Sequence, residues 1–142
     1  MQRRLVTIFG GSGFLGRALV QRLAASGWGV RVAVRDPERA AFLKPLGEVG
    51  QISIVPARVA DPEAVRLALR GADAVVNLVG ILFETRRQSI ETVHAVGAAT
   101  IAQAAREQGI STMVQMSALG VGPDSDSAYA RSKAAGEAAV RE

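Results

Sequence analysis

Cysteine is absent from this chain of 142 residues, and histidine occurs once, at His94. Without cysteine there is no disulfide scaffold and no thiolate site, and one histidine cannot build a histidine-based metal centre. We therefore expect no bound metal. Aromatic residues make up 4% of the sequence, and only Lys44 and Lys133 are lysines among 17 basic residues. Nucleic-acid surfaces usually combine a dense basic stripe with aromatics, and the arginines here are scattered, so no nucleic-acid partner is expected.

Long hydrophobic runs are also missing. The longest apolar stretches have the length of a strand, and no basic N-terminal segment precedes a long apolar run. A transmembrane helix needs about 20 apolar residues, so the sequence predicts neither a transmembrane segment nor a secretory signal. The expected location is the cytoplasm.

Alanine, valine and leucine are abundant, and 49% of the residues are hydrophobic. Short runs of strand character alternate with segments of helical periodicity. The strand-like runs are residues 5–9, 30–34, 52–55, 74–79 and 112–116. This alternation predicts right-handed βαβ units and a doubly wound parallel sheet of the Rossmann type, an α/β fold with strand order 3-2-1-4-5. Ligands of such a sheet bind outside the carboxyl ends of the strands, where the strand order reverses.

Two of the expected helices carry clear start signals. Asp36-Pro37 and Asp61-Pro62 each place a capping aspartate before a proline, which is tolerated in the first turn of a helix. The first helix has an apolar stripe that we expect to be buried, made of Leu15, Ala18, Leu19 and Leu23.

The chain stops inside an apparent helix, and no apolar strand follows it. A complete dinucleotide-binding fold has a sixth strand. We therefore expect residues 1–142 to be one truncated NAD(P)-binding Rossmann domain that lacks its C-terminal strands and its substrate region.

A glycine pattern stands at the first strand-to-helix turn, with Gly10, Gly13 and Gly16 spaced by three residues. Gly10 permits a sharp turn, Gly13 leaves room for a pyrophosphate, and Gly16 allows close packing of the helix. The N–H groups at the start of the following helix favour phosphate. The pattern therefore predicts a dinucleotide site, whose expected contacts also include Ser12, Phe14, Leu15 and Arg17.

The end of the second strand distinguishes the two nicotinamide dinucleotides. An acidic residue there accepts hydrogen bonds from both ribose hydroxyls, whereas an arginine pairs with the extra phosphate of NADP. Arg35 ends the strand and Arg17 lies near the glycine turn, which favours NADP(H) over NAD(H). The alternative is that Asp36 turns toward the ribose and selects NAD(H).

Further round the expected pocket, residues after the third and fourth strands complete the wall. Arg58 and Val59 follow the third strand and are expected beside the adenine. Leu78, Val79 and Gly80 follow the fourth strand and are expected beside the middle of the cofactor, with Gly80 allowing a close backbone approach.

The order of these motifs carries a family resemblance. The glycine turn is followed by Asn77-Leu78-Val79-Gly80, then by Ser117, and then by 129–133, which has the sequence Tyr-Ala-Arg-Ser-Lys. The chain resembles the atypical extended short-chain dehydrogenase/reductases. These are NAD-dependent epimerase/dehydratase-like proteins, and the branch in question contains the nucleotide-binding accessory subunit of respiratory complex I.

The resemblance implies a catalytic set and its chemistry. Tyr129 would be the general acid/base, although a free tyrosine titrates at about pH 10 and needs help at neutral pH. Lys133 would favour the phenolate and bind the nicotinamide ribose. Ser117 stands one residue before the usual hydrogen-bond donor, and Ala118 at that position cannot donate, so the set is incomplete. Loss of one such donor costs on the order of a hundredfold in rate.

Three functions stay open at this point. The first is an atypical protein that holds NADP(H) with little or no turnover; the resemblance implies an accessory role in complex I or quinone metabolism at the inner membrane. The second is an active NAD(P)-dependent oxidoreductase or nucleotide-sugar epimerase/dehydratase that uses Tyr129, Lys133 and Ser117. The third is a cofactor-binding module alone. The long fourth helix and the final helix are the usual pairing surfaces of the superfamily, which suggests a homodimer.

Overall fold

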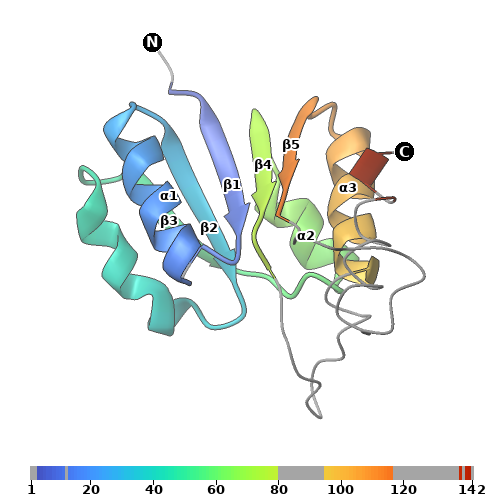
Figure 1. Ribbon diagram of the computed structural model, residues 1–142, viewed down its shortest axis with the longest axis horizontal. Helices are drawn as coiled ribbons and strands as arrows, with labels where there is room; N and C mark the ends of the chain where they lie inside the picture. Colours follow the sequence, from blue (N-terminus) through green and yellow to red (C-terminus); the bar gives the residue numbers. More distant parts are fainter. Residues whose placement is uncertain (1–2, 12, 80–94, 117–137, 139, 142) are drawn as a thin grey trace.

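The computed structural model describes residues 3–11, 13–79, 95–116, 138 and 140–141. Its strands form one parallel sheet in the order β3-β2-β1-β4-β5, which confirms the predicted Rossmann topology (Figure 1). The strands are β1 (Leu5–Phe9), β2 (Gly29–Val34), β3 (Ile52–Pro56), β4 (Ala74–Asn77) and β5 (Thr112–Gln115). The predicted β4 ran to residue 79, so the strand ends two residues earlier than expected.

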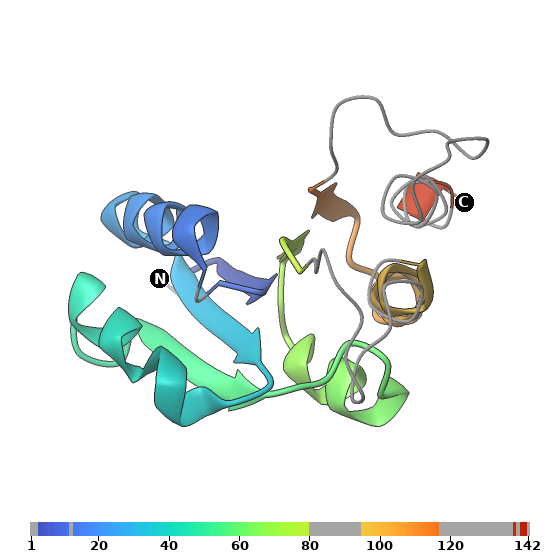
Figure 2. The same ribbon diagram turned by 60° about the horizontal axis from the view of Figure 1, so that its bottom comes forward.

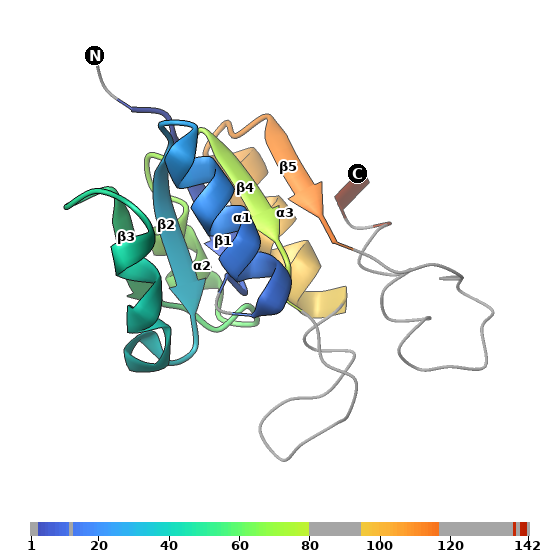
Figure 3. The same ribbon diagram turned by 60° about the vertical axis from the view of Figure 1, so that its left-hand side comes forward.

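Helices cover both faces of the sheet. They are α1 (Phe14–Ala25), the 3-10 helix η1 (Pro37–Leu46), α2 (Pro62–Ala68) and α3 (Gly97–Glu107). One apolar cluster joins α1 and η1 to one face of the sheet, and a second joins α2 and α3 to the other. Figure 3 shows this layering, with α1 in front of the sheet and α2 and α3 behind it. In Figure 2, α2 and α3 lie side by side.

The buried side of α1 differs from the predicted stripe. Its fully buried residues are Gly16, Val20 and Ala24, whereas Leu15 and Ala18 are exposed. The spacing of four residues is helical in either case, but the turn before the helix decides which side faces inward. Because Gly16 packs against that turn, Leu15 is left at the edge of the helix start.

The start of η1 matches its sequence signal, but its helix type does not match an ordinary α-helix. Asp36 is the N-cap, and its carboxylate accepts a hydrogen bond from the Glu38 N–H at 3.2 Å. Pro45 lies inside the segment and has no N–H to donate. The segment forms the tighter 3-10 helix, and the missing N–H of Pro45 falls in its last turn.

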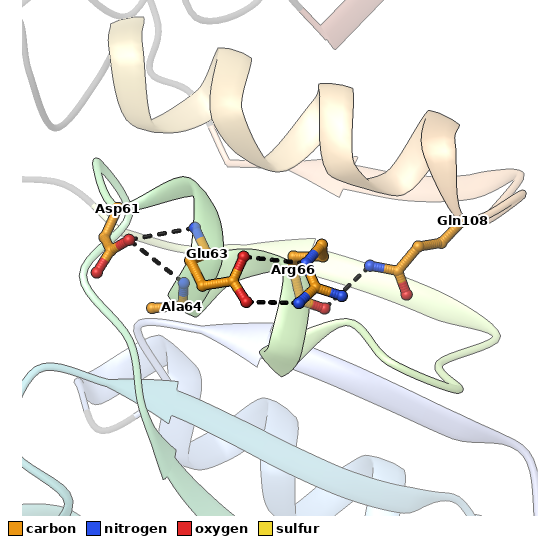
Figure 4. A network of polar contacts seen from close by, with 5 residues as sticks. All are labelled: Asp61, Glu63, Ala64, Arg66 and Gln108. Atoms are coloured by element: carbon orange, nitrogen blue, oxygen red, sulfur yellow. Dashed lines mark hydrogen bonds and ion pairs between the residues drawn. The ribbon is translucent and has the colours of Figure 1, made fainter.

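A polar network holds α2 in place (Figure 4). The Asp61 carboxylate caps the helix by accepting from the N–H groups of Glu63 and Ala64. Arg66 binds Glu63 with two nitrogens, and this hydrogen-bonded pair lowers the pKa of the Glu63 carboxyl. Gln108, after α3, donates from Nε2 to the Arg66 carbonyl at 2.9 Å. The last turn of α2 and the end of α3 are thereby tied together.

Arg31 of β2 also binds the C-terminal end of α2. Its Nη1 donates to the carbonyls of Ala68 at 2.8 Å and Arg70 at 2.7 Å, and burial lowers the pKa of its guanidinium. Arg31→Met is expected to reduce the free energy of unfolding by about 1–3 kcal/mol, since two helix-end carbonyls lose a charged donor. Denaturant unfolding measures this loss. Arg22→Met, on the exposed side of α1, is the control and should change stability by less than about 0.5 kcal/mol; equal effects would contradict the capping role.

No helix within the described part of the chain is long and apolar enough to cross a membrane.

Candidate dinucleotide-binding site

Gly10 directly follows β1, at the point where the strand order reverses between β1 and β4. Its φ is +82°, a backbone conformation that favours glycine. A Cβ at this position would lie 2.9 Å from the Val79 nitrogen and 3.1 Å from the Leu78 carbonyl carbon. Both the turn and the close approach of the β4 end therefore require glycine here, as the sequence predicted for the turn.

Gly16 is required by the turn itself. A Cβ on Gly16 would lie 2.5 Å from the Cα and from the carbonyl carbon of Gly11, which is closer than real Cβ atoms come. The close packing expected between helix and strand is therefore a packing of α1 on the turn. Gly11 is itself confined, because its Cβ would lie 2.9 Å from Val32 Cγ1. Sequence reasoning missed Gly11, and its only signal is the Gly-Gly pair.

Gly13 has open space where the other two glycines have none. The nearest atom to its added Cβ would be the Gly10 carbonyl oxygen, at 3.9 Å. Gly13 is the N-cap of α1 without a side-chain hydrogen bond, and the first turn contains no acidic residue. Since the first N–H groups of a helix lack intrahelical partners and carry the positive end of its dipole, this opening suits an anion such as a pyrophosphate.

Exposed side chains surround the start of α1. Phe14 is 91% exposed and Leu15 is 55% exposed, so both predicted contact residues are available to a ligand. The guanidinium of Arg17 lies over the ring of Phe42 in η1, with its Cζ 5.5 Å from the ring centre. This cation–π contact joins the Arg17 side chain to the middle of η1.

The residues that follow β2 and β3, together with the start of η1, form a basic hollow of about 340 Å³, lined by Arg35, Asp36, Arg39 and Arg58. We call it the arginine hollow. Arg35 and Arg58 are distant in the sequence, but β2 and β3 are parallel neighbours, so their carboxyl ends meet at one edge. Sequence reasoning missed Arg39, for which the only signal is its position three residues after Asp36.

Asp36 is already engaged within the arginine hollow. Besides capping η1, its Oδ2 lies 3.5 Å from Arg39 Nε. The carboxylate that could have accepted ribose hydroxyls is thus bound to the protein itself.

The remaining predicted residues have different positions. The side chain of Val59 is 8% exposed and packs in the cluster under α2, while the neighbouring Arg58 is exposed. Leu78 and Val79 are half-buried after β4, and the Leu78 N–H donates to the Phe9 carbonyl at 2.8 Å. The other predicted site residues lie outside the described residues: Ser12, Gly80, Ser117, Tyr129 and Lys133. Among the residues that the structure does describe, no cluster of histidines and carboxylates is arranged for a metal.

The sequence profile of the NAD(P)H-binding family matches residues 10–142, beginning at the first glycine of the turn. The chain belongs to the NAD(P)H-binding family. Two curated relatives of this NAD(P)H-binding chain carry names of different kinds, one that of a respiratory-chain subunit and one that of a reductase. NADH dehydrogenase (ubiquinone) 1 alpha subcomplex subunit 9, mitochondrial, of Arabidopsis thaliana is 38% identical over 138 residues, covering 96% of the chain and 34% of the relative. A ceramide reductase of Caulobacter vibrioides is 35% identical over 139 residues, covering 98% and 42%.

Solved structures of similar fold include a mutant uronate dehydrogenase from Agrobacterium tumefaciens complexed with NAD. It superposes with a TM-score of 0.75 at 27% identity, over 96% of this NAD(P)H-binding chain and 54% of that structure. The resemblance to epimerase/dehydrogenase-like proteins and to a complex I subunit is therefore confirmed. The chain spans less than half the length of the curated relatives described above.

Proposed function

We propose that this chain binds NADP(H), with the pyrophosphate at the start of α1 and the adenosine 2′-phosphate in the arginine hollow. The observation that carries the proposal is the engagement of Asp36 with the η1 backbone and with Arg39. An NAD(H) site needs an acceptor for the ribose hydroxyls, whereas an NADP(H) site needs cations. The arginine hollow offers three guanidinium groups against one carboxylate.

The energies of the contacts made by Asp36 and by the arginines also favour NADP(H) over NAD(H). If Asp36 rotated away from the η1 backbone to meet a ribose, η1 would lose its side-chain cap, which is typically worth about 0.5–2 kcal/mol. The ion pair with Arg39 adds little, since both side chains are exposed. A phosphate in the arginine hollow instead gains charge-assisted hydrogen bonds from forked guanidinium groups. Phosphate recognition therefore leaves the observed cap in place.

For the role of the bound cofactor, we favour a partly structural one. By the family resemblance, Ala118 would stand where active members carry a hydrogen-bond donor, and a complex I subunit is among the similar proteins. A cofactor at a hundred times its dissociation constant stabilises a folded chain by about 2.7 kcal/mol. The associated proposal is an accessory role with respiratory complex I, peripheral to its membrane.

An oxidoreductase is the second candidate, and the similarity to a ceramide reductase over 98% of the chain favours it. In that case the bound dinucleotide supplies a hydride. Tyr129 donates or accepts the proton of the reacting oxygen, Lys133 favours the phenolate, and the Ser117 hydroxyl replaces the donor missing at Ala118.

Two experiments test these proposals. The nucleotide that copurifies with the chain should have the mass of NADP(H), and a different nucleotide would contradict the cofactor assignment. Tyr129→Phe should leave cofactor affinity unchanged, and no tested carbonyl substrate should show a rate that depends on Tyr129. Loss of hydride transfer in that variant would reject the structural role and establish the oxidoreductase.

A further inference from the structure

A buried amide lies at the end of β4, beside the glycine turn. The side chain of Asn77 is 1% exposed, and both of its polar atoms have partners. Its Nδ2 donates to Gln115 Oε1 of β5 at 2.9 Å, and its Oδ1 accepts from the Val79 N–H at 3.1 Å. Burial of an amide is costly unless its hydrogen bonds are satisfied, so these two contacts keep Asn77 in one conformation.

The two side-chain amides form a relay with a single direction. Oδ1 of Asn77 must face Val79, because the NH₂ group would place one donor against another. Nδ2 then requires an acceptor on β5, which fixes Gln115 with Oε1 toward Asn77. The other end of Gln115, Nε2, donates to the Met116 carbonyl at 3.5 Å. The Val79 backbone is thereby coupled to the end of β5.

The Val79 backbone also touches the glycine turn. Its nitrogen would lie 2.9 Å from a Cβ at Gly10, so the segment 78–79 packs directly on the turn. Two backbone hydrogen bonds hold the same strand ends together: the Leu78 N–H donates to the Phe9 carbonyl, and the Met116 N–H donates to the Asn77 carbonyl. Asn77 is paired in register with Phe9 on one side and Gln115 on the other. It therefore lies at the carboxyl end of the sheet, next to the switch point between β1 and β4, where sheets of this type hold a dinucleotide in a crevice outside the strand ends.

We propose that Asn77 and Gln115 are positioning residues for the cofactor. By holding Val79 against Gly10 and the end of β5 against β4, they set the width of the crevice at the strand switch point. This inference rests on the proposed cofactor site, because crevice width is expected to control dinucleotide affinity. Neither side chain needs to touch the cofactor for this effect.

A purely structural role is the competing explanation, and a matched control separates the two. Val75→Ala removes buried volume two residues earlier on β4 and should lower the melting temperature without disturbing the relay. Asn77→Leu and the milder Gln115→Met break the relay. We expect NADPH and NADH dissociation constants to rise at least tenfold in Asn77→Leu, and severalfold in Gln115→Met. Val75→Ala should stay within twofold of the wild type.

A double-mutant cycle tests the direct contact. In Asn77→Asp alone, Gln115 can turn and donate to the new carboxylate, and in Gln115→Glu alone a carboxylate oxygen still accepts from Asn77. In the double variant two carboxylates face each other, so the effects are expected to be far from additive. The fall in melting temperature of the double variant should clearly exceed the sum of the falls in the two single variants. The fold increase in its NADPH dissociation constant should exceed the product of the two single fold increases at least tenfold.

The outcomes are distinct. If the wild type binds neither NADPH nor NADH, the proposed function fails. The double-mutant cycle of melting temperatures needs no cofactor, so it tests the relay separately. Additive changes in melting temperature would overturn the relay. If the wild type binds cofactor and Asn77→Leu weakens binding no more than Val75→Ala does, the positioning role is rejected. A selective loss of affinity together with a non-additive cycle supports it.

Discussion

Gly16→Ala is expected to abolish NADPH binding and to lower the free energy of unfolding by about 3 kcal/mol. The added Cβ would lie 2.5 Å from the Cα and carbonyl carbon of Gly11, and such backbone atoms cannot rotate away. Overpacking in a confined position typically costs about 1–3 kcal/mol, and the upper end applies where backbone must move. Denaturant unfolding and a fluorescence titration with NADPH measure the two effects.

Gly13→Ala is the matched control in the same turn. Its nearest neighbour would be 3.9 Å away, and the Gly13 backbone is extended, so stability should change by less than about 0.5 kcal/mol. The new methyl group would stand where the pyrophosphate is proposed to approach, so the NADPH dissociation constant should rise at least tenfold. A Gly16→Ala protein as stable as the wild type would refute the steric argument. An unchanged affinity in Gly13→Ala would refute the placement of the pyrophosphate.

Arg35→Ser is expected to weaken NADPH binding by about 10- to 100-fold, while NADH binding stays within twofold of the wild type. A hydrogen bond to a charged group contributes about 1.5–3 kcal/mol, which corresponds to that range of affinity. Only NADPH carries the phosphate that Arg35 would contact in the arginine hollow. Isothermal titration with each dinucleotide measures the difference.

Arg22→Ser removes a positive charge from the exposed side of α1 and serves as the control for overall charge. It should leave both dissociation constants unchanged. If Arg35→Ser weakens NADPH and NADH equally, Arg35 supports the site as a whole and does not distinguish the cofactors.

The sheet could be predicted because its signals are local and repeated. Each strand is a short apolar run between helical segments, and parallel βαβ units permit few topologies. The glycine turn was also predictable, since Gly10 and Gly16 meet backbone within a few residues or at the neighbouring strand end.

Features that depend on register could not be predicted. The bond between Asn77 and Gln115 joins residues 38 positions apart and exists because β4 and β5 pair with these two opposite each other. The inward side of α1 likewise depends on the contact between Gly16 and Gly11, which apolar periodicity does not reveal. Arg39 enters the arginine hollow because η1 begins with a tight turn at Asp36.

The most direct test of the proposed function is a parallel titration of the wild-type chain with NADPH and NADH under the same conditions. The arginine hollow contains three arginines, and its one aspartate is already bound to the protein. We therefore expect the dissociation constant of NADPH to be lower than that of NADH, by about tenfold or more if one charged contact is gained. Equal affinities, or tighter binding of NADH, would contradict it.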